Sequence, residues 1–161
     1  MKTFHTEHTH APETILDITM RDMRADDLPD VLTIERASFP TPWTEGMFLD
    51  EMRHPFCYDL VGIVEGRIVG YISFAIVFDE IHLRNIAVSE DRRRCGVASK
   101  LLLCMIEVSS QMGVRYGTLE VRESNRAALE LYKRFGFVVK GARPYYYSDT
   151  GETALIMWAD F

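Results

Sequence analysis

LRNIAVSEDRRRCGVASK, from Leu83 to Lys100, begins as an apolar strand, passes through a charged turn and enters a helix within Arg93–Ala98. Apolar residues then recur at helical spacing, which predicts an amphipathic helix with one buried face. That face is expected to hold Val97, Ala98, Leu101, Leu102, Met105, Ile106 and Ser109. The N–H groups and positive dipole of a helix start favour a bound phosphate, and Gly96 lets the backbone approach it closely.

The spacing R-x-x-G-x-A is short, and an arginine-rich turn before a helix is often only a solvated turn. The surrounding chain adds to the motif. Gly113 ends the helix, and residues 118–121 (TLEV) follow as a short strand. A helix between two strands predicts a parallel crossover, so the strand at 118–121 should run parallel to the one ending at Val88.

The composition of the 161 residues, 47% hydrophobic, predicts one domain with a sizeable core. A net charge of −6 argues against direct nucleic-acid binding and favours a basic partner. Ile68–Phe78, the longest apolar stretch, is too short to span a membrane, and the first residues lack the apolar region of a secretory signal. Because Cys57, Cys95 and Cys104 show neither disulfide nor metal-ligand spacing, we expect a cytoplasmic protein without a metal.

Residues 1–14 are expected to be a flexible tail, including His5, His8 and His10, and residues 15–161 a single domain. The patterns predict strands at 15–23, 58–64, 67–78, about 80–88, 118–121, 137–147 and 154–161, and helices beginning near 25, 44, 97 and 125. The order β-α-α-β-β-β-α-β-α-β-β indicates a mixed sheet covered by helices on both faces. The strand at 67–78 is apolar without alternation, so both its faces should be covered.

Local signals accompany these elements. An Asp cap with Pro29 should start the first helix, whose apolar side is Leu28, Val31, Leu32, Ile34 and Phe39. Thr44 should cap the second helix, and Ser124-Asn125 the last. The last helix is expected to bury Ala127, Ala128, Leu131, Tyr132 and Phe135. Glu65-Gly66 predicts a tight turn between two strands.

Four features occur in one order: N-I-A-V at 85–88, R-x-x-G-x-A at 93–98, L-E-V-R-x-S-N at 119–125 and A-x-x-L-Y-x-x-x-G-F at 128–137. Together they resemble the GCN5-related N-acetyltransferase (GNAT) superfamily, from about Ile18 to the end of the chain. The chain is most similar to the RimI-type enzymes, which acetylate the N-terminal alanine of a small-subunit ribosomal protein. Phe39-Pro40, Pro42-Trp43-Thr44-Glu45 and Arg143-x-x-Tyr146-Tyr147 carry that similarity.

The resemblance implies an α/β (α+β) acyl-CoA N-acyltransferase fold. This fold has a mixed, mostly antiparallel seven-stranded sheet, helices on both faces and a splay between the two parallel central strands. Two positions depart from the family pattern. Arg93 stands where Gln is commoner, and Thr153 stands where Asp is frequent, which puts the peptide end of the site in doubt.

The resemblance also implies acetyl-CoA as co-substrate and direct transfer in a ternary complex. The pantetheine arm would lie on the main chain of Ile86, Ala87 and Val88, and Asn125 would bond it. The pyrophosphate would lie on the N–H groups of Arg94, Cys95, Gly96, Val97, Ala98 and Ser99, in a binding turn whose first residue is Arg93. Ordinary roles compete with these: a core strand at 86–88, a solvated turn, and a helix cap at Asn125.

Glu120 is the expected general base and Tyr132 the expected general acid. Alternatively, Glu120 is an outward-facing strand residue and Tyr132 a core aromatic. Trp43, Tyr146 and Tyr147 either form the walls of a peptide pocket or belong to the core or rim.

The sequence leaves three functions open: acetylation of a protein N-terminus, acetylation of a polyamine or amino acid, and a non-catalytic acyl-CoA-binding module. Glu120 and Tyr132 argue against the silent module, and Trp43 with the paired tyrosines favours a peptide. An α-amino group, with a pKa of about 7.7–8.0, is easier to deprotonate than lysine by roughly 3.5 kcal/mol. We therefore expect acetyl-CoA and a basic ribosomal protein tail as partners of a monomer or weak dimer.

Overall fold

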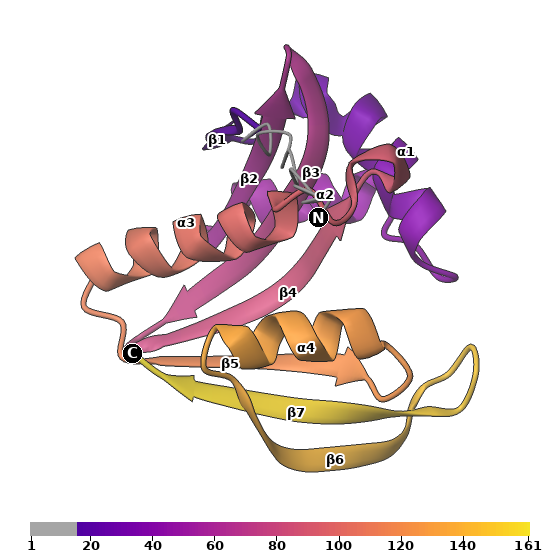
Figure 1. Cartoon of the computed structure of the whole chain (residues 1–161), viewed down its shortest axis with the longest axis vertical. Helices are drawn as coiled ribbons and strands as arrows, with labels where there is room; N and C mark the ends of the chain where they lie inside the picture. The colour runs from indigo at the N-terminus through magenta and orange to yellow at the C-terminus, as the bar shows by residue number, and fades with distance from the viewer. Residues whose placement is uncertain (1–15) are drawn as a thin grey trace, which may run out of the picture.

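The strands of the computed structural model, which describes residues 16–161, pair into a sheet of order β1-β2-β3-β4-β5-β7-β6 (Figure 1). The strands are β1 Thr19–Asp22, β2 Cys57–Val64, β3 Arg67–Val77, β4 Glu80–Val88, β5 Tyr116–Arg122, β6 Val138–Tyr147 and β7 Glu152–Asp160. The helices are α1 Leu28–Ser38, α2 Glu45–Arg53, α3 Val97–Gln111 and α4 Arg126–Arg134, with 3₁₀ turns at Ala25–Asp27 and Glu90–Arg92. The expected tail, with its three histidines, lies outside the described residues.

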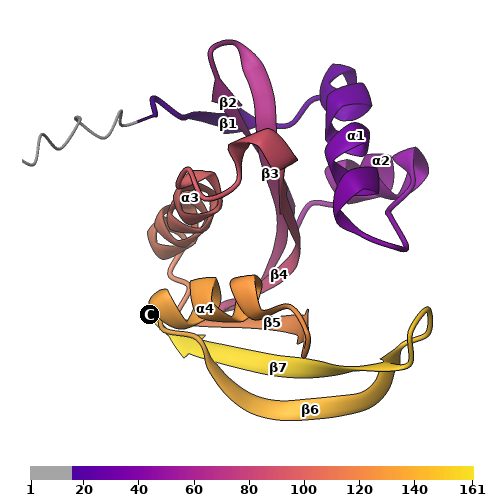
Figure 2. The same cartoon turned by 45° about the vertical axis from the view of Figure 1, so that its right-hand side comes forward.

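The pairing of β4 with β5 is parallel, as the crossover through α3 predicts, and the other pairings of the described sheet are antiparallel. This parallel pairing runs from Glu80 opposite Tyr116 to Leu83 opposite Leu119 and stops there. At the same level Ser73 pairs with Asn85 and Phe74 with Leu83, so Arg84 is an extra residue in β4. Such a bulge bends a strand, and β4 and β5 diverge beyond it (Figures 1 and 2). The predicted splay is confirmed.

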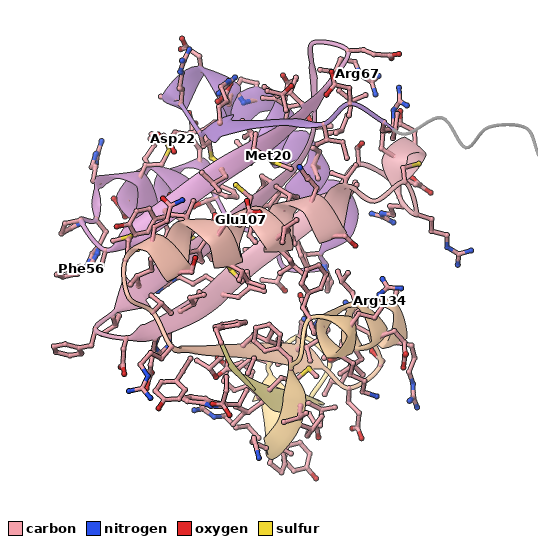
Figure 3. The ribbon with its side chains drawn as sticks, turned by 60° about the vertical axis from the view of Figure 1, so that its left-hand side comes forward. Met20, Asp22, Phe56, Arg67, Glu107 and Arg134 are labelled. Carbon is pink, nitrogen blue, oxygen red and sulfur yellow. The ribbon has the colours of Figure 1, made fainter. Side chains whose placement is uncertain are left out.

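The helices cover the two faces of the sheet in pairs (Figure 2). Residues of α3 and α4 pack with β2–β5 in one cluster, beside which Met20 of β1 also lies (Figure 3). Residues of α1 and α2 pack with Val61, Tyr71 and Ala87 in a second cluster on the opposite face. The inner residues of β3 are buried from Val69 to Ile76, so the prediction that both its faces are covered is confirmed.

The predicted caps and turns explain several element boundaries. Thr44 Oγ1 accepts a hydrogen bond from the Met47 N–H (3.3 Å), and Asn125 Oδ1 accepts one from the Ala128 N–H (3.2 Å). Glu65 and Gly66 both have positive φ, 50° and 76°, as a tight hairpin turn requires. These local signals act through the backbone, so they hold wherever the element packs.

Some sequence expectations are corrected. The first strand covers only Thr19–Asp22. Asp27 does not cap α1: its carboxylate binds Arg21 (2.6 Å) and the Arg24 N–H (2.8 Å), and the Arg21 guanidinium lowers the pKa of that carboxyl. Phe39 follows α1 in extended conformation.

On α4, Ala127 is exposed where burial was predicted, and Leu129, which was not on the predicted face, is buried. Tyr132 is buried as predicted, and Ala128, Leu131 and Phe135 are partly buried against the core. Within residues 16–161, none of the helices is both long enough and apolar enough to cross a membrane.

Candidate active site

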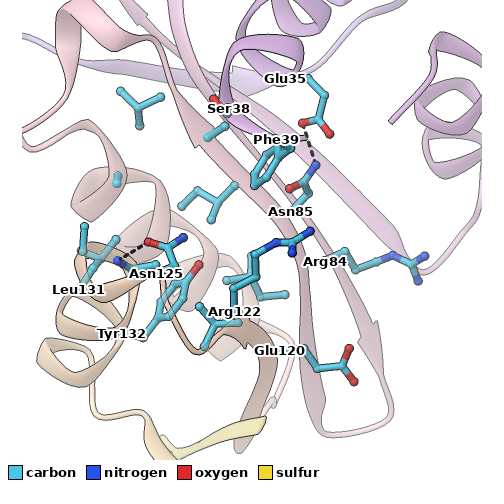
Figure 4. A pocket seen from close by; sticks show the side chains of 18 of the residues that line it. Glu35, Ser38, Phe39, Arg84, Asn85, Glu120, Arg122, Asn125, Leu131 and Tyr132 are labelled. Atoms are coloured by element: carbon cyan, nitrogen blue, oxygen red, sulfur yellow. Dashed lines mark hydrogen bonds between the residues drawn. The ribbon is translucent and has the colours of Figure 1, made fainter. Parts of the chain in front are cut away.

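A cavity of about 1080 Å³ opens where β4 and β5 separate (Figure 4). Its walls come from the ends of β4 and β5, the first turn of α3, α4, the α1–α2 loop (residues 39–44) and the β6–β7 turn (residues 148–151). Elements far apart in the sequence therefore meet at the break in the sheet. The volume lies just above the usual range for small-molecule sites, roughly 300–1,000 Å³.

The start of α3, with the turn before it, has the geometry expected of a phosphate-binding cradle, and residues 93–99 are called the cradle. Arg94 and Gly96 both have positive φ, 59° and 83°, and no side chain caps the helix, whereas Thr44 and Asn125 cap α2 and α4. The N–H groups of an uncapped first turn need other partners. A Cβ at Gly96 would meet nothing within 4 Å, so the approach to these groups is open. An uncapped turn with space before it fits a phosphate.

Two arginines of the basic turn are engaged with the protein. Arg93 donates to the Val88 carbonyl (3.2 Å) and to Ser38 Oγ (3.4 Å), tying the turn to the ends of β4 and α1. Arg92 pairs with Glu65 at 3.2 Å. The side chain of Arg93 thus holds the shape of the cradle, which leaves its main chain to face a ligand.

Most of the predicted ligand-binding residues line the cavity: Ile86, Ala87, Val88, Arg93, Arg94, Gly96, Val97, Ala98, Ser99 and Asn125. Cys95 does not, because its side chain is exposed and its thiol donates to the Arg93 carbonyl (3.4 Å). Asn125 both caps a helix and faces the cavity, the two positions that the sequence left open. Its carboxamide oxygen caps α4 while its amide nitrogen points away from the helix toward the cavity (Figure 4).

Glu120 lines the cavity from β5, beyond the last residue paired with β4. Its carboxylate forms an ion pair with Arg143 of β6 at 3.2 Å and raises the pKa of the neighbouring Tyr146 hydroxyl. The side chain remains 31% exposed, so water reaches it. Glu120 is therefore an exposed residue on the cavity wall, and Arg143 balances its charge.

The ring of Tyr132 lies in the core, and its hydroxyl faces the cavity. The residue is 6% exposed, and its ring packs edge-on against Phe137 with centroids 6.1 Å apart. The hydroxyl is directed into the cavity (Figure 4). Burial, with a smaller contribution from Tyr147, raises the pKa of the phenol, so the hydroxyl keeps its proton at neutral pH.

The aromatic residues predicted for a peptide pocket also line the cavity. Trp43 is half-buried against Phe48, with centroids 5.2 Å apart. Tyr146 and Tyr147 stand perpendicular at 5.1 Å, and the Arg122 guanidinium lies 3.9 Å from the Tyr147 ring centroid. These residues belong to the α1–α2 loop and to β6, which are different segments from the start of α3.

Asp149 joins two of these segments. It accepts hydrogen bonds from both terminal nitrogens of Arg122 (3.1 and 2.7 Å) and one from Thr41 Oγ1 (3.2 Å). The Arg122 guanidinium lowers the pKa of Asp149. The α1–α2 loop and the β6–β7 turn are thereby linked beside the cavity.

Sequence reasoning missed Glu35, Asn85, Arg122 and Asp149 as cavity residues. Glu35 carried a usable signal, because it lies three and four positions after Leu32 and Val31, on the apolar stripe of α1. An acid at such a position is expected to be buried and bonded. Arg122 and Asp149 are 27 positions apart, and nothing local announces their pairing.

A sheet that opens between two parallel strands beside an uncapped helix defines the class of this protein. Residues 28–137 match the model of the Acetyltransferase (GNAT) family, and the chain belongs to this family. The resemblance noted from the motifs is confirmed. The match covers the α1–α2 region, the cradle, and both Glu120 and Tyr132.

Relatives extend the match beyond that segment. A Bacillus subtilis protein named for ribosomal protein bS18-alanine N-acetylation is 39% identical over 140 residues, 86% of this chain and 93% of its own. The Escherichia coli K12 ribosomal protein bS18-alanine N-acetyltransferase is 34% identical over 142 residues, 86% and 95% of the two chains. The crystal structure of the Escherichia coli S18-alanine N-acetyltransferase superposes with a TM-score of 0.82 at 32% identity, over 89% and 93%. The predicted fold is confirmed.

Cys95 is expected to be the thiol most readily alkylated in the free protein. It is exposed beside Arg94 and a helix start, whereas Cys57 and Cys104 are half-buried. Burial, with a contribution from Glu51, raises the pKa of Cys57 to about 12, and burial raises the pKa of Cys104 as well. Iodoacetamide labelling mapped by mass spectrometry measures this. Labelling at Cys95 no faster than at Cys104 contradicts the prediction.

Proposed function

We propose that this protein transfers the acetyl group of acetyl-CoA to the N-terminal alanine of ribosomal protein bS18. The observation that carries the proposal is the agreement of two relatives bearing that activity in their names, each over 86% of this chain. The cavity adds a chemical reason, because it holds both a carboxylate and a protonated phenol, at Glu120 and Tyr132.

Acetyl-CoA fits the residues that line the cavity. The uncapped N–H groups at Val97–Ser99 suit its pyrophosphate, and the edge of β4 from Arg84 to Val88, which β5 no longer pairs, suits the amides of the pantetheine arm. The Asn125 amide nitrogen offers a further donor. The co-substrate supplies an acetyl thioester and the acceptor supplies the amine; side chains and backbone groups of this chain hold the two together and move the protons.

The reaction requires the acceptor nitrogen to lose two protons and the departing sulfur to gain one. The acceptor amine must lose a proton to become a nucleophile, and Glu120 takes it, directly or through water. The amine nitrogen then bonds the thioester carbonyl carbon, and the carbon–sulfur bond breaks. The departing thiolate takes the hydroxyl proton of Tyr132, and the nitrogen gives up its second proton, which passes through water to the phenolate and restores Tyr132. Because the pKa of Tyr132 is raised, the hydroxyl is available as a donor at neutral pH.

An N-terminal amine suits this machinery better than a lysine. With one solvent-reachable carboxylate as base, the roughly 3.5 kcal/mol lower cost of deprotonating an α-amino group favours the N-terminus. The net charge of −6 favours a basic chain behind that terminus. Trp43, Tyr146 and Tyr147 provide apolar surface for the first side chains of a peptide. These features support a peptide over a polyamine.

A peptide panel tests the proposal. With acetyl-CoA, an arginine-rich peptide that begins with alanine should be acetylated at its α-amino group, in preference to the same peptide with a blocked N-terminus and to spermidine. Its KM should rise with salt, because ions screen the attraction between an acidic protein and a basic peptide. Mass spectrometry locates the acetyl group.

Each other outcome points to a competing function. Preference for spermidine would make the protein a small-amine acetyltransferase. Binding of acetyl-CoA without transfer to any amine, in a protein with Glu120 and Tyr132 intact, would make it a non-catalytic acyl-CoA-binding module.

A further inference from the structure

Glu35 of α1 is a buried acid with no part in the proton movements above. Only 1% of the residue is exposed, and it lies on the cavity wall. Oε1 accepts the main-chain N–H of Trp43 (2.8 Å), while Oε2 accepts Asn85 Nδ2 (2.9 Å) and the Tyr71 hydroxyl. Figure 4 shows the bond to Asn85. A carboxylate thus accepts hydrogen bonds from three donors.

These donors come from different parts of the fold. Tyr71 is wholly buried in β3, and Asn85 in β4 directly follows the bulge residue Arg84. Asn85 also donates to the Tyr71 hydroxyl (3.0 Å), which closes a ring of hydrogen bonds. Trp43 belongs to the α1–α2 loop. Glu35 therefore ties that loop to the sheet at the place where the sheet opens.

The chemistry of the group fits an anchoring role. Burying a carboxylate is costly unless it is fully bonded, and burial raises the pKa of Glu35 although the Trp43 N–H and Asn85 oppose this. A leucine at this position would satisfy the apolar stripe of α1, but it could not hold a main-chain N–H of a loop. What the carboxylate adds is a fixed backbone position for Trp43.

We propose that Glu35 is a positioning residue for the acceptor: its carboxylate fixes the backbone of Trp43 and thereby holds the α1–α2 loop as the acceptor-side wall of the cavity. The role rests on the proposed function, because it assigns this wall to the acceptor. Of the elements assigned to acetyl-CoA, Val97–Ser99 and the Asn125 side chain form no hydrogen bond with this ring in the described structure. The β4 edge shares Asn85 with the ring, but pairing with β3 holds the backbone of that edge. Loss of the anchor should therefore affect the two substrates unequally.

The test uses the only two tryptophans of the chain. In a Trp158→Phe background, Trp43 is the sole indole, and Trp158 is not part of the cavity wall. Glu35→Gln keeps the shape of the side chain but replaces one acceptor oxygen by a donor. The emission of Trp43 should shift to the red and become more readily quenched by acrylamide. The KM of the alanine peptide should rise roughly tenfold, the usual effect of losing a hydrogen bond to a charged group, with the KM of acetyl-CoA within about twofold.

Asp59→Asn is the matched control. Asp59 of β2 is another buried carboxyl, 8% exposed, which accepts a hydrogen bond from Ser73 and is not part of the cavity wall. Its loss should lower stability without moving Trp43 emission or either KM. An equal change of peptide KM in both variants would reduce Glu35 to a general stabilising residue.

Tyr71→Phe provides a second variant if Glu35→Gln does not fold. It removes one donor to Glu35 and keeps the ring that packs against Phe48 at 5.5 Å. It should shift the peptide KM and Trp43 emission in the same direction by a smaller factor. Unchanged Trp43 emission and peptide KM in the folded variant overturn the proposal. If the wild type acetylates no peptide, the proposed function fails, while Trp43 emission still shows whether Glu35 holds the loop.

Discussion

Replacing Glu120 by glutamine is expected to lower kcat/KM for the alanine peptide by about 10²–10⁴, the usual contribution of a general base. The amide keeps the size of the side chain but cannot take a proton. Affinity for acetyl-CoA should hardly change, because the cradle at the start of α3 lies on another element. Activity of the variant should recover in part as the pH rises, since more of the amine is then already neutral. Steady-state kinetics from pH 6 to 10 and calorimetric titration with CoA measure both parts.

Glu123→Gln is the control for this substitution. Glu123 follows the same strand, is exposed, and is not part of the cavity wall. Its loss removes the same charge from the protein, so long-range electrostatic effects on a basic peptide should be equal in both variants. Activity of Glu120→Gln close to that of Glu123→Gln at pH 7 would remove Glu120 from the mechanism.

Replacing Tyr132 by phenylalanine is expected to lower kcat by about 10²–10⁴ while leaving the fold intact. The ring packs against Phe137 and stays in place, so the free energy of unfolding should change by no more than about 1 kcal/mol. The substitution removes only the proton that the thiolate would take. Because burial raises the pKa of Tyr132, wild-type kcat should show no loss of this acid below about pH 10, the ordinary value for tyrosine.

Tyr58→Phe provides the comparison for Tyr132→Phe. Tyr58 is half-buried, stacks on Phe74 with centroids 5.4 Å apart, and is not part of the cavity wall. Both substitutions remove one hydroxyl from a packed ring. Unchanged kcat in both variants would show that Tyr132 is structural.

How much of the fold could be predicted from the sequence depends on how far apart along the chain the interacting residues lie. Thr44, Asn125 and the Glu65-Gly66 turn were predictable, because each acts on backbone groups within three residues. The exposure of Ala127 and the burial of Leu129 were not predictable, because the apolar residues of a helix show the same spacing whether they cover a core or line a cavity. On α4 the small residue faces the cavity, and the large one fills the core.

In the candidate site, too, residues within local motifs were predictable and contacts between distant strands were not. The cradle and the pair Glu120 and Tyr132 lie in contiguous motifs, and their positions on the cavity wall agree with the motif reading. The roles of these residues remain predictions until the variants are measured. The partners of Glu120 and Glu35 come from strands distant in the sequence, Arg143 in β6 and Tyr71 in β3. No local pattern specifies those pairings, which arise only when the sheet assembles.

The break between β4 and β5 makes the sheet mechanically two panels that share a seam of four residue pairs. One panel carries β1–β4, and the other carries β5–β7. A molecule that bonded both open edges would lengthen the seam, and its binding free energy would add to the free energy of unfolding. A substrate bound in this position stabilises the fold as well as reacting. The melting temperature of the protein then reports how fully the site is occupied, without any turnover.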